Sequence, residues 1–325
     1  MSEPQDLYEA INAETSEVLV GYEDVIEKIT IAILTNGHIL LEGVPGVAKT
    51  TAARLFARAS NLQYQRVQMT PDVLPADITG THVYRENSGE FKLRRGPIFT
   101  NVLLADEINR ATPKTQSALL ESMRERTATI EGDTLEVPRP FLVIATQNPV
   151  EYEGTYSLPQ AQRDRFLFKI IMDIPERDIE RQVLDRFTRD PELGPEDIEP
   201  AINPAQVGEA RDVVQQIHVE DAVYEYLLDI IGTTRTHEAT EFGASPRASV
   251  SFLHATQARA ALKGREYVIP ADIQTLANDV LNHRIILDTD ADLSGQTSQD
   301  VIDEILRSVD PPEADLSIEV HSTDD

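Results

Sequence analysis

A glycine-rich segment near the start of the chain has the residues needed to bind phosphate. It lies between a short apolar run at 38–41 and a helical pattern at 50–59. Main-chain N–H groups that precede a helix bind phosphate oxygens, and the helix adds positive potential. We expect Lys49 to neutralise the β and γ phosphates of ATP and the Thr50 hydroxyl to bind Mg²⁺. The predicted phosphate loop comprises Gly43, Val44, Pro45, Gly46, Val47, Ala48, Lys49 and Thr50.

One position departs from the strict phosphate-loop pattern. That pattern has glycine immediately before the lysine, where this chain has Ala48. We expect Ala48 to adopt helical dihedral angles, so that no positive φ is required there. Taken alone, the segment is also compatible with an ordinary glycine-rich turn, and the motifs that follow favour phosphate binding.

Two carboxylates follow a second apolar run, at 102–105. We expect Asp106 to orient the water ligands of Mg²⁺ and Glu107 to polarise the water that attacks the γ-phosphate. The alternative is a pair of surface acids at the start of a helix. Asn148 follows the apolar run 141–145 and could share the attacking water, although an asparagine before a proline is equally typical of a turn.

The apolar runs predict an α/β fold. Together with 66–69 and 166–171 they indicate a buried five-stranded parallel sheet with helices on both faces, and two further segments, 81–93 and 127–137, have the pattern of β-hairpins. After about residue 175 the pattern becomes entirely helical. We therefore predict a nucleotide-binding core at 1–175, a small helical domain at 176–290 and an acidic extension at 291–325. The segment from Asp310 onward has six acids and is expected to be disordered or, alternatively, to bind a partner.

The composition limits the function further. The net charge is −27, and only six of the 29 basic residues are lysines, which suggests adaptation to a high-salt cytoplasm, with an acidic protein of ordinary salt as the alternative. Nucleic acids and anionic lipids both require a basic face and are disfavoured. The absence of cysteine excludes disulfides and thiolate zinc sites. We expect no membrane span and no secretory signal, hence a cytoplasmic protein.

Four segments together resemble one known family. The segments 41–50, 105–111, 145–149 and 243–247 are similar, in sequence and in order, to the MoxR group of AAA+ ATPases, and the similarity extends over residues 15–290. The resemblance implies a P-loop NTPase αβα sandwich, a helical lid domain and a hexameric ring. It also identifies the first hairpin as the insert in the second core helix and the other as the insert before the first sensor.

The resemblance assigns roles to particular residues as well. Asn148 corresponds to the first sensor, and Arg247 to a second sensor that would contact the γ-phosphate from the lid. Val20 and Gly21 fall where the family contacts adenine. Arg165 aligns with the arginine finger that reaches the neighbouring subunit, and Arg163 remains a competitor because the family usually has an apolar residue at that position.

Members of this family often act as chaperones that mature client proteins or insert metal cofactors. They commonly work with a separate protein that carries a von Willebrand factor A-type domain. Two other functions remain open. One is a nucleotide-gated switch with slow hydrolysis. The other is a nucleic-acid motor, for which the first hairpin has basic residues but the second is acidic. The sequence does not indicate the client.

Overall fold

The computed structural model describes residues 3–87, 89–149 and 154–312. Its centre is a sheet with the order β2-β5-β8-β1-β9, in which all neighbouring strands are parallel. The prediction of a five-stranded parallel sheet is therefore confirmed. The strands are β1 (Ile39–Glu42), β2 (Tyr64–Gln68), β5 (Val102–Asp106), β8 (Leu142–Gln147) and β9 (Phe168–Ile171).

Alternating side chains of the central strands enter two separate apolar cores. Leu41, Leu104 and Ile144 pack on one face with the first three helices, whereas Leu40 and Leu103 pack on the other with the fourth and fifth. Side chains alternate between the faces of a strand, so a strand buried on both faces reads as a continuous apolar run. The core helices are α1 (Pro4–Ser16), α2 (Glu23–Leu34), α3 (Lys49–Ala59), α4 (Pro75–Thr79), η1 (Ile108–Arg110), α5 (Pro113–Glu125) and α6 (Gln160–Arg163).

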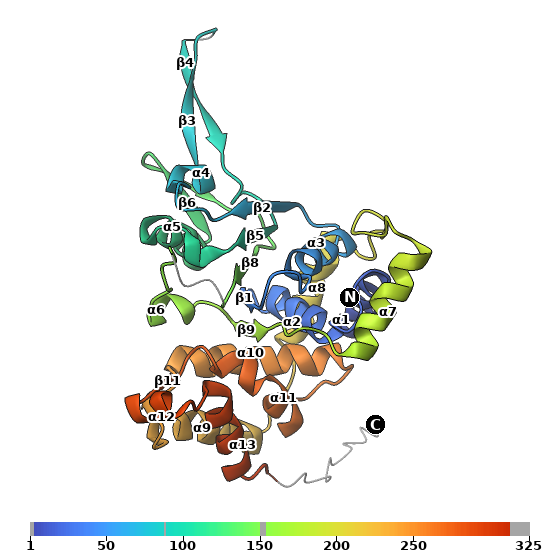
Figure 1. Cartoon of the computed structure of the whole chain (residues 1–325), viewed down its shortest axis with the longest axis vertical. Helices are drawn as coiled ribbons and strands as arrows, with labels where there is room; N and C mark the ends of the chain where they lie inside the picture. The colour runs from blue at the N-terminus through green and yellow to red at the C-terminus, as the bar shows by residue number, and fades with distance from the viewer. Residues whose placement is uncertain (1–2, 88, 150–153, 313–325) are drawn as a thin grey trace, which may run out of the picture.

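Both predicted hairpins are present. Strands β3 (Gly80–Arg85) and β4 (Glu90–Arg95) form an antiparallel arm that extends away from the core (Figure 1). The second hairpin, β6 (Thr127–Ile130) and β7 (Asp133–Glu136), lies beside the base of the first. Glu131 links the two, because its carboxylate accepts from the Thr81 hydroxyl at 3.1 Å and lies 3.2 Å from the His82 ring.

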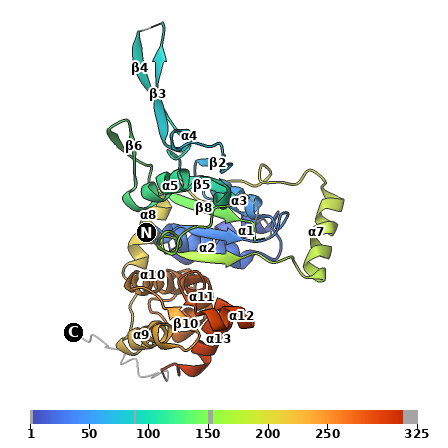
Figure 2. The same cartoon turned by 60° about the vertical axis from the view of Figure 1, so that its left-hand side comes forward.

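The two helices after the sheet lie against the core. Helix α7 (Arg177–Arg189) stands at the side of the sheet (Figure 2) and has no buried residue. Its Arg186 donates to the carbonyls of Ser16 and Glu17 after α1. Helix α8 (Pro204–Val214) is anchored to α2 by Arg211, which donates to the Ile33 carbonyl. The boundary at residue 175 stays a prediction.

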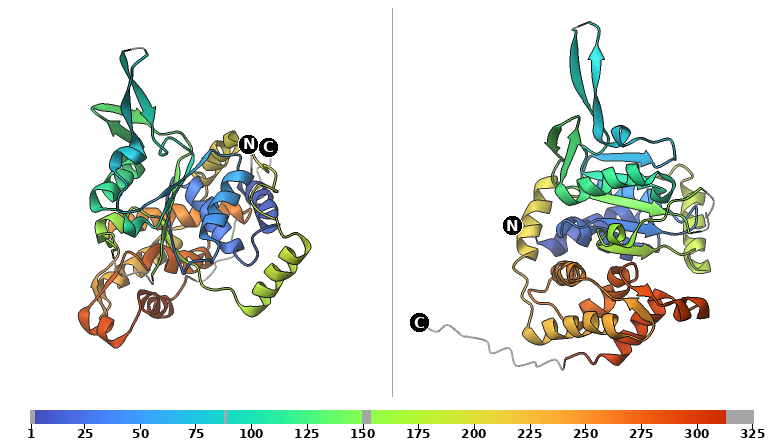
Figure 3. Two further views of the ribbon diagram at one scale, coloured as in Figure 1. Left: turned by 45° about the horizontal axis from the view of Figure 1, so that its top comes forward. Right: turned by 90° about the vertical axis from the view of Figure 1, so that its left-hand side faces the viewer.

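The remaining helices form a separate layer below the sheet (Figure 3), which confirms the expected helical lid. The side of α10 facing the core approaches α1 and α2. The elements are α9 (Asp221–Thr236), β10 (Thr240–Phe242), α10 (Pro246–Leu262), α11 (Pro270–Leu281), β11 (Ile286–Leu287), α12 (Thr289–Ser294) and α13 (Ser298–Ser308).

The last described helix belongs to the packed structure. Val301, Ile302 and Ile305 of α13 are fully buried in the larger core. The predicted acidic tail falls mostly at 313–325, outside the described residues. Among the described helices, none is both long and apolar enough to cross a membrane.

Candidate functional site: the nucleotide cavity

The segment predicted to be the phosphate loop connects β1 to α3. Lys49 is the first residue of α3, so the amides of the first helical turn have no partner within the helix and face the loop. Gly43 has almost no space above its Cα, because a Cβ there would lie 2.4 Å from the Met172 carbonyl oxygen. The loop therefore runs tightly over the end of β9 and turns its amides toward the cavity.

The expected conformation of Ala48 was wrong. Its φ of 59° and ψ of 19° place it in the left-handed region, and Gly46 has a φ of 92°. An L-residue in this region is disfavoured by about 1–2 kcal/mol, since its Cβ approaches the following carbonyl oxygen. The loop thus requires the conformation that glycine adopts easily, and alanine adopts it here.

Lys49 is folded back onto the loop. Its Nζ donates to the carbonyl of Gly43 and, at 2.9 Å, to that of Val44. Burial lowers the pKa of Lys49, while the carboxylates of Asp106, Glu107 and Glu42 oppose this shift. The ammonium group is therefore held among carbonyl and carboxylate oxygens, where a triphosphate would compete for it.

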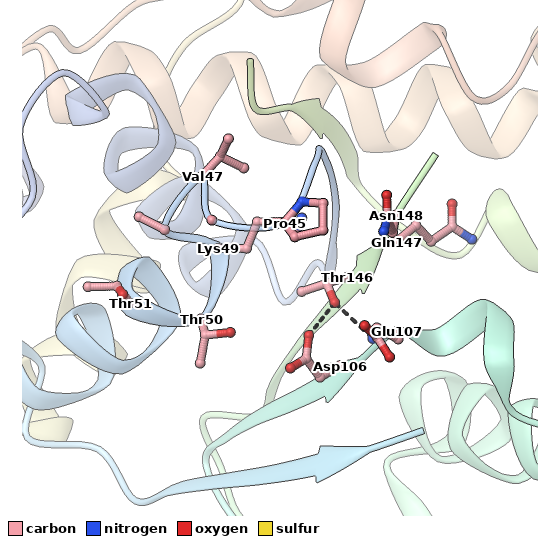
Figure 4. A pocket seen from close by; sticks show the side chains of 12 residues that line it. Pro45, Val47, Lys49, Thr50, Thr51, Asp106, Glu107, Thr146, Gln147 and Asn148 are labelled. Carbon is pink, nitrogen blue, oxygen red and sulfur yellow. Dashed lines mark hydrogen bonds between the residues drawn. The ribbon is translucent and has the colours of Figure 1, made fainter. Parts of the chain in front are cut away.

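The two carboxylates at the end of β5 are joined by Thr146 of β8. The Thr146 hydroxyl donates to Asp106 Oδ1 at 2.6 Å and accepts the Glu107 N–H at 2.8 Å (Figure 4). Glu107 has a φ of 57°, a second left-handed residue in the cavity. This turn directs Glu107 away from the strand, so that both carboxylates line one cavity.

Side chains of β2 hold both carboxylates, which the sequence analysis did not anticipate. The Arg66 guanidinium contacts Asp106 Oδ2 from Nε at 3.0 Å and from Nη2 at 2.5 Å. Gln68 donates to Glu107 Oε2 at 2.7 Å, and Arg110 donates to the same oxygen at 3.0 Å. The sequence does contain a signal, the i, i+2 spacing of Arg66 and Gln68 at the end of a strand, which places both side chains on one face. This spacing points to the carboxylates only once β2 is known to pair with β5.

The predicted phosphate loop and the ends of β5 and β8 line a cavity of about 310 Å³. Asn148, at the end of β8, is on its wall and is itself buried. Gly43 and Val44 lie at the entry of the loop and are not part of the lining. The lining consists of Pro45, Gly46, Val47, Ala48, Lys49, Thr50, Thr51, Asp106, Glu107, Thr146, Gln147 and Asn148.

Several predicted residues lie outside this cavity. Val20 is buried and Gly21 lies against Ile179 of α7. Arg165 donates to the Leu120 carbonyl at 2.5 Å, and burial lowers its pKa. In the lid, Ser245 caps α10 and Pro246 begins it, which places Arg247 in the first helical turn, 3.8 Å from Asp164.

Arg163 lies nearer to the chain's own cavity. It lines a neighbouring cavity that shares Gln147 and Asn148 with the first. The structure therefore separates the two candidate arginines. Arg163 borders the nucleotide cavity of its own chain, whereas Arg165 lines a different hollow with Asn36 and His254.

The site suits a magnesium nucleotide. The tight loop and its left-handed residues direct main-chain amides at one region, as phosphate binding requires. The Thr50 hydroxyl and the Asp106 carboxylate supply the oxygen ligands that Mg²⁺ prefers. A glutamate and a buried asparagine lie across the cavity from the loop (Figure 4), in position to orient water. A three-layer core, a phosphate loop, paired carboxylates and a helical lid together define a P-loop ATPase of the AAA class.

Comparison with known proteins agrees with this class. The ATPase family associated with various cellular activities (AAA) matches residues 38–168, and the AAA lid domain matches residues 232–305. The chaperone MoxR1 of Mycobacterium tuberculosis is 41% identical over 92% of this chain and 81% of its own length. The protein YeaC of Bacillus subtilis is 44% identical over 91% of this chain and 92% of its own.

A solved structure agrees as well. A proposed ATPase from Cytophaga hutchinsonii is 38% identical to this chain and superposes with a TM-score of 0.88, covering 95% of this chain and 96% of the other. The protein MoxR of Methylorubrum extorquens is 31% identical over 92% of this chain and 93% of its own. The chain belongs to the MoxR family of AAA+ ATPases.

Proposed function

We propose that this protein hydrolyses ATP to ADP and phosphate in a ring of identical subunits, and that it acts as a chaperone which remodels a client protein. The observation that carries the hydrolytic part is the convergence of Lys49, Asp106, Glu107 and Asn148 on one cavity at the end of the parallel sheet. The chaperone role is supported by membership of a family of ATPases that includes a named chaperone.

Each residue has a role that follows from its position. The loop amides and Lys49 hold the phosphates, while Glu107 and Asn148 orient the attacking water. Bound Mg²⁺ would be held by Thr50 and Asp106 and would supply charge neutralisation at the phosphates. Lys49 leaves the Gly43 and Val44 carbonyls, and Arg66 yields its place on Asp106. Lys49 and Asp106 thus exchange contacts within the protein for contacts to the nucleotide and its metal ion, so that neither charge is left buried without a partner.

Arg165 is proposed to act on the next subunit. Its position outside its own nucleotide cavity supports this role, because a finger in a ring acts across the interface. Arg247, held near Asp164 beside Arg165, would reach the γ-phosphate from the lid after a change in lid angle. Hydrolysis then depends on assembly, for which we propose a hexamer.

A subunit-mixing experiment tests this proposal. In molar KCl, which the acidic surface is expected to require, Glu107→Gln should bind ATP without turnover. Arg165→Ala should also bind ATP, and its turnover should fall about 10³-fold or more. In a 1:1 mixture, Glu107→Gln subunits supply the finger to intact sites of Arg165→Ala neighbours, and about a quarter of the interfaces of a head-to-tail ring regain activity. Arg307→Ala, on the exposed face of α13, is the matched control and should retain wild-type turnover.

The outcomes separate the steps of the proposal. Turnover by Arg165→Ala alone would remove the trans finger, and a mixture as inactive as its parents would place both residues in one subunit's site. Failure of the wild-type protein to bind MgATP by calorimetry in molar KCl would refute the nucleotide site itself.

A slow nucleotide-gated switch is the second candidate, and one observation favours it. Asp106 is paired with Arg66, and Lys49 with loop carbonyls, so the described conformation must rearrange before hydrolysis. Turnover measured with and without a partner distinguishes a switch from a chaperone. A separate protein with a von Willebrand factor A-type domain is the proposed partner, on family resemblance alone.

A nucleic-acid motor is the third candidate. Arg85, Lys92, Arg94 and Arg95 lie on the first hairpin, and all four are exposed. Stimulation of the ATPase by single-stranded DNA, lost with added salt, would favour this function. The client is best captured with Glu107→Gln in ATP, because a subunit that cannot hydrolyse keeps its partners bound.

A further inference from the structure

A second cavity of about 310 Å³ lies directly beside the nucleotide cavity. The two share Gln147 and Asn148, the residues at the end of β8. Asn109 and Ser157 contribute further polar groups to its wall. This volume is large enough for a five-atom oxyanion together with bound water.

The wall of this cavity has a cation. Arg163, at the end of α6, lines it, and burial lowers the pKa of the guanidinium group. Its Nε is buried and has no hydrogen-bond partner in the described part of the chain. A partly buried cation of this kind is stabilised by an anion, and a guanidinium group suits the oxygens of phosphate.

The balance of charge in the cavity favours an anion. Its carboxylate is Glu42, which attracts the Arg163 guanidinium and opposes the lowering of its pKa, and whose Oε1 also lies 2.9 Å from the Nζ of Lys169. Glu42 is thus shared by two cations, so that Arg163, Lys169 and Glu42 together have one positive charge, although the whole chain has a net charge of −27. Many other arginines here lie close to carboxylates, as Arg66 and Arg284 do to Asp106 and Asp164.

We propose that the Arg163 cavity binds inorganic phosphate, the second product of ATP hydrolysis, after it has left the γ position. This inference rests on the proposed function. The shared residues Gln147 and Asn148 provide the passage, because a phosphate that moves past Asn148 enters the second cavity without crossing the bound ADP. Arg163 acts here on its own subunit, which leaves Arg165 for the neighbour.

Orthophosphate itself is the probe for the test. Equilibrium dialysis with ³²P-orthophosphate is performed on full-length protein saturated with MgADP in molar KCl. We expect saturable binding of phosphate by the wild-type protein. Arg163→Leu, which restores the apolar character usual for the family, should bind it about 10- to 100-fold more weakly, as expected for the loss of a charge-assisted contact. Arg163→Lys should recover part of the affinity, because it keeps the charge without the planar fork.

Two controls make the result specific. Arg307→Leu removes an exposed positive charge from α13, a helix that contributes no residue to the cavity lining, and should bind phosphate like the wild type. ADP affinity, measured for every variant, shows whether Arg163→Leu keeps a folded nucleotide site.

The inference and the proposed function can fail separately. Equal phosphate binding by the wild type and Arg163→Leu would place the ion in the γ position and overturn the inference, whether or not ATP is hydrolysed. Absence of saturable phosphate binding in a protein that does hydrolyse ATP would overturn it too. A wild-type protein that binds phosphate through Arg163 but never cleaves ATP would refute the hydrolytic function and leave an anion site.

Discussion

We expect acidification to destabilise the protein through one buried histidine, His38, both of whose ring nitrogens have main-chain partners. His38 precedes β1, and its side chain is buried against Phe141. Its Nδ1 accepts the Val143 N–H at 3.0 Å, and its Nε2 lies 3.2 Å from the Met123 carbonyl oxygen. The ring therefore fits as the neutral tautomer with hydrogen on Nε2. A second proton would have to sit on Nδ1, facing the Val143 N–H.

Protonation of this histidine favours the unfolded chain over the folded protein. Burial lowers the pKa of His38 to about 4, and Arg126 adds to this shift, against 6.5 for an unfolded histidine. The unfolded chain takes up the proton first, so stability is complete above pH 6.5 and is lost as the pH falls toward 4. The loss from this residue is about 2 kcal/mol at pH 5 and about 3 kcal/mol once both states are protonated.

Chemical denaturation in molar KCl at pH 8, 6.5 and 5 measures the effect. Other groups titrate as well, among them His283, whose pKa is also lowered by burial. The quantity to follow is therefore the wild-type unfolding free energy minus that of His38→Gln. It should decrease by about 2 kcal/mol between pH 8 and 5. His254→Gln, at an exposed histidine, is the matched control. A difference for His38→Gln that stays constant over this range would refute the argument.

Two substitutions in the nucleotide cavity test its local geometry. Ala48→Gly should stabilise the protein by about 0.5–1 kcal/mol in the same assay, because relief of the left-handed alanine outweighs the added chain entropy of glycine, whereas Gly46→Ala should destabilise it. A lower stability of Ala48→Gly would contradict the assigned backbone. Thr146→Val should lower stability by about 1–3 kcal/mol and raise the Mg²⁺ concentration needed for ATP binding, since it removes hydrogen bonds to Asp106 and from the Glu107 N–H. Thr146→Ser keeps the hydroxyl and should behave like the wild type.

The strands were predictable because a parallel sheet covered on both faces leaves continuous apolar runs. The run at 102–105 became β5, and the run at 141–145 became most of β8. The order of the strands was not predictable in this way, because neighbouring strands in the sheet are distant in sequence. Arg66 and Gln68 illustrate the consequence. Their roles depend on β2 lying next to β5, a pairing that no local pattern in the sequence records.

Helix α7 shows a different limit of sequence reasoning. Ile179, Val183, Leu184 and Phe187 recur at helical spacing, a pattern typical of an apolar helix face packed in a core. The helix is present, but Leu184 is 64% exposed and Phe187 is 41% exposed. Periodicity identifies a face and not its partner, so it cannot distinguish packing within this chain from packing against another molecule.

Local conformational propensity fails to predict the backbone at two residues of the nucleotide cavity. Among the described residues, six other than glycine have a positive φ, and Ala48 and Glu107 are the two in the nucleotide cavity. An asparagine, as at positions 36 and 61, tolerates this conformation through local hydrogen bonds, whereas alanine and glutamate gain nothing comparable. Such backbone persists only where surrounding structure determines it. Here Ala48 turns the loop into α3, and Glu107 turns the end of β5 toward the water that it is proposed to orient. Two of the four described positive-φ residues that are neither glycine nor asparagine therefore lie where the proposed chemistry needs a sharp change of direction, and the other two, Arg126 and Glu131, flank strand β6 of the second hairpin.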